Sequence, residues 1–373
     1  MKLLPVAPGR PLRVAVFRAL ALGDQLNAVP ALRALRAALP DARITLIGLP
    51  WSRGWVHRFS QYLDDFLEFP GYPGIPEVAF EPTRLTTFLQ AVQADPFDLV
   101  IQLHGSGLAS NPFCALLGAR AMAGFYLPGG WCPDPDRFVP YPGHLHEARR
   151  YLALMDHLGA PSRGEELEFP LADDERTAAW ALAGKHGLLP GRFACLHPGA
   201  SAAARRWPLE RFAAVGDALA QRGLRVVLTG TPGEAPLTAE VAARIQAPAV
   251  DLAGRTSLGE LGALLEHARL LVANDTGVSH LAAALSVPSV IVFLASDPRR
   301  WAPLDDRLHR VVGDPGQVNA CRHVPGESHR CLRDGCTMAD RSGQPRFHPE
   351  VRVGQVLAEV DDLLAAEDDA DVA

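Results

Sequence analysis

The sequence has no uninterrupted apolar run of the roughly 18 residues that a membrane-spanning helix requires, so we expect no such helix. Prolines interrupt the first residues, MKLLPVAPGRPLRVAVF, which therefore lack the apolar core of a secretory signal peptide. Positive charge is not in excess either, because 36 Lys and Arg against 42 Asp and Glu give a net charge of −6. This balance disfavours nonspecific binding to nucleic acid, which needs a basic surface. We therefore expect a cytoplasmic protein.

Cysteine is scarce and unevenly placed. Three of the six cysteines are scattered, as is usual for reduced thiols of cytosolic proteins: Cys114, Cys132 and Cys195. The other three lie together with two histidines in the late segment CRHVPGESHRCLRDGC: Cys321, Cys331 and Cys336. A zinc site and a surface loop with reduced thiols are both open for this segment. The spacing fits no standard zinc motif, which favours the loop, and we predict no metal site.

The 373 residues, 48% of them hydrophobic, suffice for two domains with sizeable cores. The most informative stretch is 270–292, LLVANDTGVSHLAAALSVPSVIV, whose pattern predicts a strand, a loop, a helix and a strand. Asp275, Thr276 and Gly277 then lie between a strand and the amino end of a helix, where an anion is favoured. His280 lies one turn later and is predicted to face the loop. A helix N-capped by Asp275, without any ligand, explains the same pattern, so both interpretations are open.

The chain also begins with a βαβ pattern. The predicted elements are a strand at 13–18, a loop at 19–24, a helix at 27–39 and a strand at 44–48. No GxGxxG occurs there, so the dinucleotide-binding fingerprint is absent. Gly23 is predicted where the backbone turns closely. Asp24 is predicted at the amino end of the helix. There it is either an N-cap or a catalytic group, and the residue taken alone favours the N-cap.

A buried strand is predicted at 97–103, and it ends at His104. The carboxyl ends of parallel strands share one edge of a sheet, so His104 is predicted to face the same rim as Asp24. A loop histidine that bonds to the backbone is the alternative.

Several other segments have a predicted place. Residues 127–142 are rich in Pro, Gly and aromatic residues and predict an irregular surface loop or substrate lid. On the helix that follows, Arg149 and Arg150 are predicted to form a solvated face. Residues 159–175 are polar and predict the connection between domains. A closing helix is predicted at 351–366, followed by a frayed acidic tail.

Four loops of the second half are predicted at strand carboxyl ends. They carry Ser201 with Arg205, Gly230 with Glu234, Arg255 with Thr256, and the loop that begins at Asp275. Hydroxyls, cations, glycines and backbone N–H groups in one place suit a diphosphate. Each member also has a plain structural interpretation: the Arg pair can flank Trp207 as a packing anchor, and Glu234 can be an exposed loop acid.

With these residues in place, the chain resembles glycosyltransferase family 9, the bacterial heptosyltransferases. The matching pieces are RVAVFRALALGDQLNAVPALRALRAALP, HPGASAAARRWPLERF, and LLVANDTGVSHLAAAL with VPSVIVF. The resemblance implies an α/β GT-B fold, in which two Rossmann-like domains with parallel sheets face each other across a cleft. Residues 1–165 would bind the acceptor and residues 166–350 the nucleotide-sugar donor, with the helix at 351–366 packing back on the first domain.

The resemblance also implies an activity: inverting, metal-independent transfer of a heptose from ADP-heptose to a lipopolysaccharide-core or related glycan acceptor, without a cofactor. Asp24 would be the general base. The implied phosphate contacts are Ser201, Arg205, Thr276 and Gly277, and the remaining donor contacts are Gly230, Glu234, Asp275 and His280. The implied acceptor contacts are Arg18, Gly23 and His104. Asp275, an acid beside the phosphates, is expected to cap its helix or to bind sugar hydroxyls.

Arg205 stands where the family commonly has Lys, which keeps the charge and changes the geometry. A peripheral contact with the inner face of the inner membrane is a further expectation from the resemblance. A nucleotide-sugar epimerase of similar fold and a non-catalytic nucleotide-sugar-binding protein are the alternatives. The sequence does not decide the sugar, the acceptor, the linkage or the oligomeric state.

Overall fold

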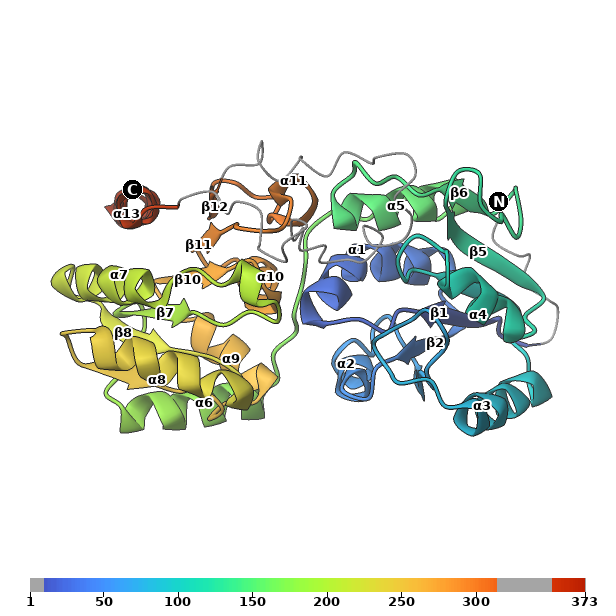
Figure 1. Cartoon of the computed structure of the whole chain (residues 1–373), viewed down its shortest axis with the longest axis horizontal. Coiled ribbons are helices and arrows are strands. Elements are labelled where there is room, and N and C mark those ends of the chain that lie inside the picture. Colours follow the sequence, from blue (N-terminus) through green and yellow to red (C-terminus); the bar gives the residue numbers. More distant parts are fainter. Residues whose placement is uncertain (1–9, 314–350, 373) are drawn as a thin grey trace, which may run out of the picture. The chain divides into compact units, whose positions relative to one another are not determined.

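A computed structural model describes residues 10–313 and 351–372, with side chains for 10–313 and 351–366. The chain divides into two compact units, Met1–Glu166 and Leu167–Ala373. Each unit is an α/β structure built on its own six-stranded parallel sheet (Figure 1). None of the helices in the described part of the chain combines the length and the hydropathy of a membrane span.

The sheet of the first unit has the strand order β3-β2-β1-β4-β5-β6, and every neighbouring pair is parallel. Its strands are β1 (Arg13–Phe17), β2 (Arg43–Gly48), β3 (Asp65–Glu68), β4 (Leu99–Gln102), β5 (Ala121–Tyr126) and β6 (Phe138–Pro140). Its helices are α1 (Leu22–Ala38), α2 (Ser52–Arg58), α3 (Pro82–Ala94), α4 (Ser110–Leu116) and α5 (Glu147–Leu158). The central strands β1 and β4 are almost wholly apolar, as strands covered on both faces must be.

The sheet of the second unit has the order β12-β11-β10-β7-β8-β9, again all parallel. Its strands are β7 (Phe193–His197), β8 (Arg225–Leu228), β9 (Ala249–Asp251), β10 (Leu270–Asn274), β11 (Ser289–Val292) and β12 (His309–Val312). Its α-helices are α6 (Asp173–Lys185), α7 (Leu209–Gln221), α8 (Ala235–Arg244), α9 (Leu258–Leu265), α10 (Gly277–Ala284), α11 (Pro298–Trp301) and α13 (Val353–Val372). Two short 3-10 turns lie in its loops, η1 (Ala203–Arg205) and η2 (Pro232–Glu234).

Both sheets therefore have the same Rossmann strand order, counted from the first strand of each unit. The order reverses between β1 and β4 in the first unit and between β7 and β10 in the second. Ligands of open parallel sheets bind at such reversal points, beyond the carboxyl ends of the two strands. The loops after these four strands are therefore the places to look for function.

Helix α1 begins at Leu22, so the predicted loop at 19–24 is wrong in its last three residues. Gly23 and Asp24 lie in the first turn of the helix, and the N-cap is Ala21, without a side-chain cap. Pro30 lies inside the helix rather than in its first turn. The helix continues through this proline because most of its residues are buried, and tertiary packing outweighs the lost backbone hydrogen bond.

The closing helix α13 packs on the second unit, against α7, β11 and β12 (Figure 1). Val356, Val360 and Leu363 are at most 3% exposed and belong to the same core as Trp207 and Phe212. The prediction that this helix packs back on the first domain is therefore wrong. The helix also runs to Val372 rather than ending at residue 366.

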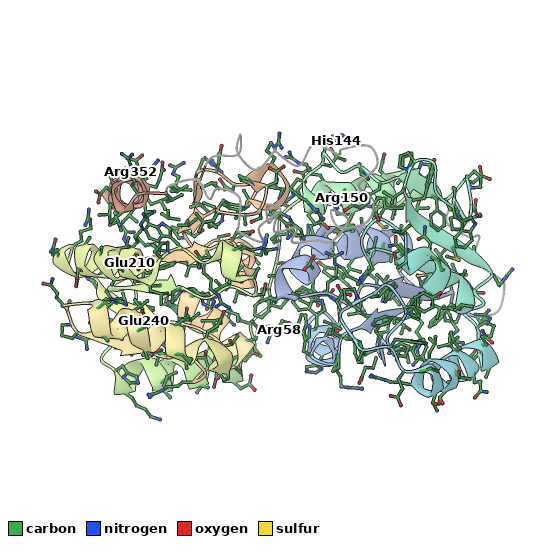
Figure 2. The ribbon with its side chains drawn as sticks, in the orientation of Figure 1. Arg58, His144, Arg150, Glu210, Glu240 and Arg352 are labelled. Carbon is green, nitrogen blue, oxygen red and sulfur yellow. The ribbon has the colours of Figure 1, made fainter. Side chains whose placement is uncertain are left out.

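Two smaller predictions for the first unit need correction. The segment 127–142 is not wholly irregular, because β6 within it pairs with β5. Arg149 is exposed as predicted, whereas Arg150, labelled on α5 in Figure 2, is 1% exposed. Arg150 is buried because it pairs with Glu147 one helical turn away, at 2.8 Å.

Candidate functional site

Arg18, directly after β1, is the centre of a buried polar cluster in the first unit. Its guanidinium is wholly buried and clamps Asp24: Nε donates to the Asp24 carbonyl at 2.8 Å, and Nη2 lies 3.3 Å from the Asp24 carboxylate. Nη1 donates to the Leu103 carbonyl and, at 2.6 Å, to the Tyr151 hydroxyl. Burial alone would lower the pKa of Arg18, but its neighbours Tyr151, Asp24 and Glu147 raise it above the ordinary value. The cation is therefore held in place and stays charged.

The predicted acceptor contacts Arg18 and Gly23 need correction on this geometry. The Arg18 side chain is 1% exposed and its nitrogen atoms are directed at protein acceptors, among them the carbonyl of Asp24. Gly23 is buried inside α1, where its carbonyl accepts a hydrogen bond from the Asn27 amide, so it makes no tight turn. Asp24 is the accessible group of this cluster, with a side chain that is 19% exposed.

His104, after β4, is buried beside the same cluster. Its ring stacks on Phe17 at a centroid distance of 4.9 Å, and its Nδ1 accepts a hydrogen bond from the Ala19 N–H. Burial, helped by the nearby Arg18 cation, lowers the pKa of His104 to about 3. The ring is therefore neutral and carries its proton on Nε2, which lies 3.7 Å from the Glu77 carboxylate. The backbone-bonded alternative describes it better than an acceptor contact.

Asn274, the last residue of β10, holds both ends of the loop between β7 and α7. Its side chain is fully buried; Oδ1 accepts from the Trp207 N–H at 2.9 Å, and Nδ2 donates to the Pro198 carbonyl at 2.9 Å. Trp207 in turn donates from its indole to the Val351 carbonyl. One amide thus fixes the loop after β7 and the start of α7 relative to β10, across the reversal point of the sheet.

Asp275 and Arg205 meet at this reversal point. Arg205 Nη1 lies 3.9 Å from Asp275 Oδ2, and the Ser296 hydroxyl, from the loop after β11, donates to the same oxygen. Burial raises the pKa of Asp275, while Arg205 and Ser296 partly offset that effect. The prediction that Asp275 caps its helix is wrong, because Thr276 is the N-cap of α10 and makes no side-chain cap bond. The first N–H groups of a helix have no intrahelical partner, so α10 presents a positive end here.

Glu234 is held from several sides and is not an exposed loop acid. Its carboxylate accepts hydrogen bonds from the N–H and hydroxyl of Thr231, at 2.8 and 2.9 Å. A Cβ added to Gly199 would lie 2.0 Å from Glu234 Oε1, so any side chain at position 199 would displace this carboxylate. His197 Nε2 lies 3.8 Å from the carboxylate, and burial lowers the pKa of His197. The result is an oriented acceptor next to the loop after β7.

The other predicted donor residues take varied positions. Ser201 is exposed in the loop after β7, and no hydrogen bond joins it to the cluster among the described residues. Gly230 pairs with the loop after β9, since its carbonyl accepts from the Gly254 N–H at 2.8 Å. His280 is buried in α10, with its ring 6.2 Å from that of Trp301.

The second unit therefore combines a partly exposed guanidinium, an uncapped helix amino end and an oriented carboxylate. A cation with backbone N–H groups binds phosphate, and a fixed carboxylate binds hydroxyls such as those of a sugar. The first unit offers one accessible carboxylate on a buried cation. Comparison with known proteins gives this chemistry a family: residues 85–327 match the family described as glycosyltransferase family 9 (heptosyltransferase). The chain belongs to glycosyltransferase family 9.

Full-length relatives agree with this family 9 membership. Lipopolysaccharide heptosyltransferase 3 of Escherichia coli K12 is 26% identical over 352 residues, which cover 86% of this chain and 98% of the relative. The solved structure of E. coli ADP-heptose lipopolysaccharide heptosyltransferase II aligns with a TM-score of 0.70 at 21% identity, over 96% and 100% of the two chains. E. coli heptosyltransferase WaaC with ADP-2-deoxy-2-fluoro heptose aligns with a TM-score of 0.57 at 22% identity, over 82% and 94%. The predicted GT-B-like fold is confirmed.

The sequence pattern missed several residues of the two clusters of this family 9 chain. Asn274 had a signal, because it is a polar residue at the end of an apolar run. Ser296 and Tyr151 had none, since each acts on a residue far from it in the sequence. Glu147 and Arg150 are three residues apart on one helix, a spacing that allows pairing.

No group of three or more His, Cys, Asp or Glu side chains with metal-binding geometry occurs in residues 10–313 and 351–366. The cysteine segment at 321–336 lies outside the described residues. Both interpretations of that segment therefore stay open.

The neutral state of His104 predicts an acid-sensitive first unit. A histidine whose folded pKa is below its unfolded value of about 6.5 stabilises the protein above that value, and the stabilisation is lost as pH falls towards the folded pKa of about 3. At pH 5 the loss from His104 is about 2 kcal/mol. Between pH 7 and pH 5 the melting temperature should therefore fall less in His104→Gln than in the unchanged protein. Gln keeps an acceptor for the Ala19 N–H. An equal fall in melting temperature in both proteins would show that burial does not lower the pKa of His104.

Proposed function

We propose that this protein transfers a heptose from ADP-heptose to a lipopolysaccharide-core or related glycan acceptor, with inversion and without a metal ion. The observation that carries the proposal is the Arg205–Asp275 pair at the amino end of α10, in a member of the heptosyltransferase family. Arg205 and the helix end supply positive charge for a departing diphosphate. The Asp275 carboxylate beside them is an acceptor for hydrogen bonds from sugar hydroxyls.

The donor belongs to the second unit in this proposal. Arg205 is 23% exposed at its side chain, so it can turn a nitrogen to phosphate while it stays near Asp275. Gly277 allows close approach of a phosphate to the backbone of α10. Thr276, directly before it, and Ser201, in the same loop as Arg205, are the candidate hydroxyl donors. Gly230 and Glu234 shape the neighbouring loop, and Glu234 is the candidate acceptor for ribose hydroxyls. The relative solved with ADP-2-deoxy-2-fluoro heptose supports this choice of donor.

The acceptor and the general base belong to the first unit. An inverting transfer needs one base to take the proton of the acceptor hydroxyl as the donor leaves. Asp24 fits this role, because its carboxylate is accessible and is oriented by a buried cation. Arg18 and His104 then act behind it instead of binding the acceptor. A glycolipid acceptor implies a cytoplasmic protein that contacts the inner face of the inner membrane peripherally.

The test is a transfer assay with purified protein, ADP-heptose and a core acceptor that lacks its terminal heptose. We expect ADP release and a heptosylated product, and both should require the acceptor. ADP-heptose without acceptor is the control for an epimerase, which would change the donor alone. Absence of transfer with ADP-heptose and with other nucleotide sugars would refute the proposal.

A further inference from the structure

A chain of buried polar contacts leads from α5 to Asp24. The Tyr151 hydroxyl accepts from Arg18 Nη1 at 2.6 Å and donates to Glu147 Oε1, and the Arg18 guanidinium also lies 4.5 Å from the centre of the Tyr151 ring. Glu147 Oε2 accepts from Arg150 Nη1 at 2.8 Å. The order of groups is therefore Arg150, Glu147, Tyr151, Arg18 and Asp24. Helix α5 packs along α1, which brings these groups together.

The exposure of the four charged members differs sharply. The side chains of Arg150, Glu147 and Arg18 are 1%, 3% and 1% exposed, whereas that of Asp24 is 19% exposed. Two cations balance two carboxylates only when Asp24 is counted, so the Asp24 carboxylate is the counter-ion of the second buried cation. The one member that solvent, and thus a substrate, reaches is the carboxylate at the end of the chain.

We propose that Tyr151 and Glu147 are positioning residues for the transfer reaction, which hold Arg18 in the geometry that orients the Asp24 carboxylate. This inference rests on the proposed function, since it takes Asp24 as the base. Neither residue touches substrate in it, and each acts through Arg18. Arg150 fixes Glu147 from the other side.

The Tyr151 hydroxyl suits this task because it accepts from the cation and donates to the carboxylate at the same time. Burial raises the pKa of Tyr151 well above its usual value, so the hydroxyl keeps the proton that it donates to Glu147. Phenylalanine at position 151 would keep the ring beneath the guanidinium. Arg18 Nη1 would lose the hydroxyl as acceptor and keep the Leu103 carbonyl. The guanidinium could then rotate, and the carboxylate of Asp24 with it.

The experiment compares Tyr151→Phe with the unchanged protein in the transfer assay. We expect kcat to fall between about threefold and tenfold, the range for one buried hydrogen bond, while the affinity for ADP, bound by the second unit, is unchanged. Glu147→Gln, which removes the charge and keeps the size, should lower kcat in the same way. It replaces Tyr151→Phe as the test if that variant does not fold.

The matched control is Ser289→Ala, which removes another buried hydroxyl, bonded to His309 at 2.8 Å at the amino ends of β11 and β12. It should lower the melting temperature and leave kcat unchanged. A fall in melting temperature alone, without a change in kcat, would show that Tyr151 is merely structural and would overturn the inference.

A double-mutant cycle with Asp24→Asn separates positioning from general damage. If Tyr151 acts through the Asp24 carboxylate, Tyr151→Phe should cost nothing further in the Asp24→Asn background. The same fold-loss in both backgrounds would overturn the inference. A normal kcat for Asp24→Asn would overturn the role of Asp24 as base together with the inference, whereas an inactive Asp24→Asn with a normal Tyr151→Phe would overturn the inference only. Absence of transfer by the unchanged protein would overturn the proposed function itself.

Discussion

Asp24→Asn should lower kcat for heptosyl transfer by about 10²–10⁴-fold, the usual contribution of a general base. Asn cannot take the proton of the acceptor hydroxyl, but its Oδ1 can still accept from Arg18. The Asp24 carbonyl and the Glu147 carboxylate also remain close to that buried cation. The variant should therefore fold, with a melting temperature lower by a few degrees, and bind ADP normally. The measurement is kcat at saturating donor and acceptor, with a melting curve and an ADP titration.

Asp64→Asn is the matched control for this substitution. Asp64 pairs with Arg36 of the same helix α1, at 2.6 Å, so the control also removes an arginine-paired carboxylate from the first unit. It should leave kcat unchanged. A near-normal kcat in Asp24→Asn would show that Asp24 is a structural residue of the first turn of α1 and not the base.

Arg205→Ala should weaken ADP binding by about tenfold to a hundredfold. A charge-assisted hydrogen bond contributes roughly 1.5–3 kcal/mol, and alanine removes the charge that faces the diphosphate. The loss of Arg205 also removes the cation beside the buried Asp275, so the negative charge of this carboxylate near the phosphates is no longer offset. Calorimetric titration with ADP measures the effect.

Two further variants sharpen this prediction. Arg205→Lys keeps the positive charge and should lose less affinity than the alanine variant, although a single ammonium cannot reproduce the fork of a guanidinium. Arg225→Ala removes an exposed positive charge at the amino end of β8 in the same unit, and should leave ADP binding unchanged. An unchanged affinity for ADP in Arg205→Ala would show that Arg205 does not bind the donor.

Much of the architecture could be predicted, because buried parallel strands appear in the sequence as short apolar runs that end in polar loops. The stretch 270–292 shows this best, since β10, α10 and β11 follow one another there in the predicted order of strand, helix and strand. The start of α1 was wrong because its first turn has neither a side-chain cap nor a clear apolar stripe. The place of α13 was wrong because an amphipathic helix does not reveal which core it covers.

The sequence identified most of the candidate residues, but it did not show which residues they contact. A sequence puts Arg18 and Asp24 near each other, yet it does not show that the guanidinium is turned inward by Tyr151, 133 residues away. His104 was likewise placed at the right strand end, but the sequence left open whether it faces a ligand or bonds to the backbone, as it does at Ala19. Burial and hydrogen-bond direction depend on contacts between distant segments, and these decide which polar residues face a ligand.

The position of α13 affects how the protein can fold while it is synthesised. The first unit is one continuous stretch that ends at Glu166, so all of its core has been translated while the whole of the second unit is still to come. The core of the second unit includes Val356, Val360 and Leu363, which follow the rest of that core in the sequence. Domains generally fold as units during synthesis, the N-terminal one first. The second unit should therefore reach its native packing only after α13 has left the ribosome, and core residues such as Trp207 and Phe212 lack part of their apolar cover until then.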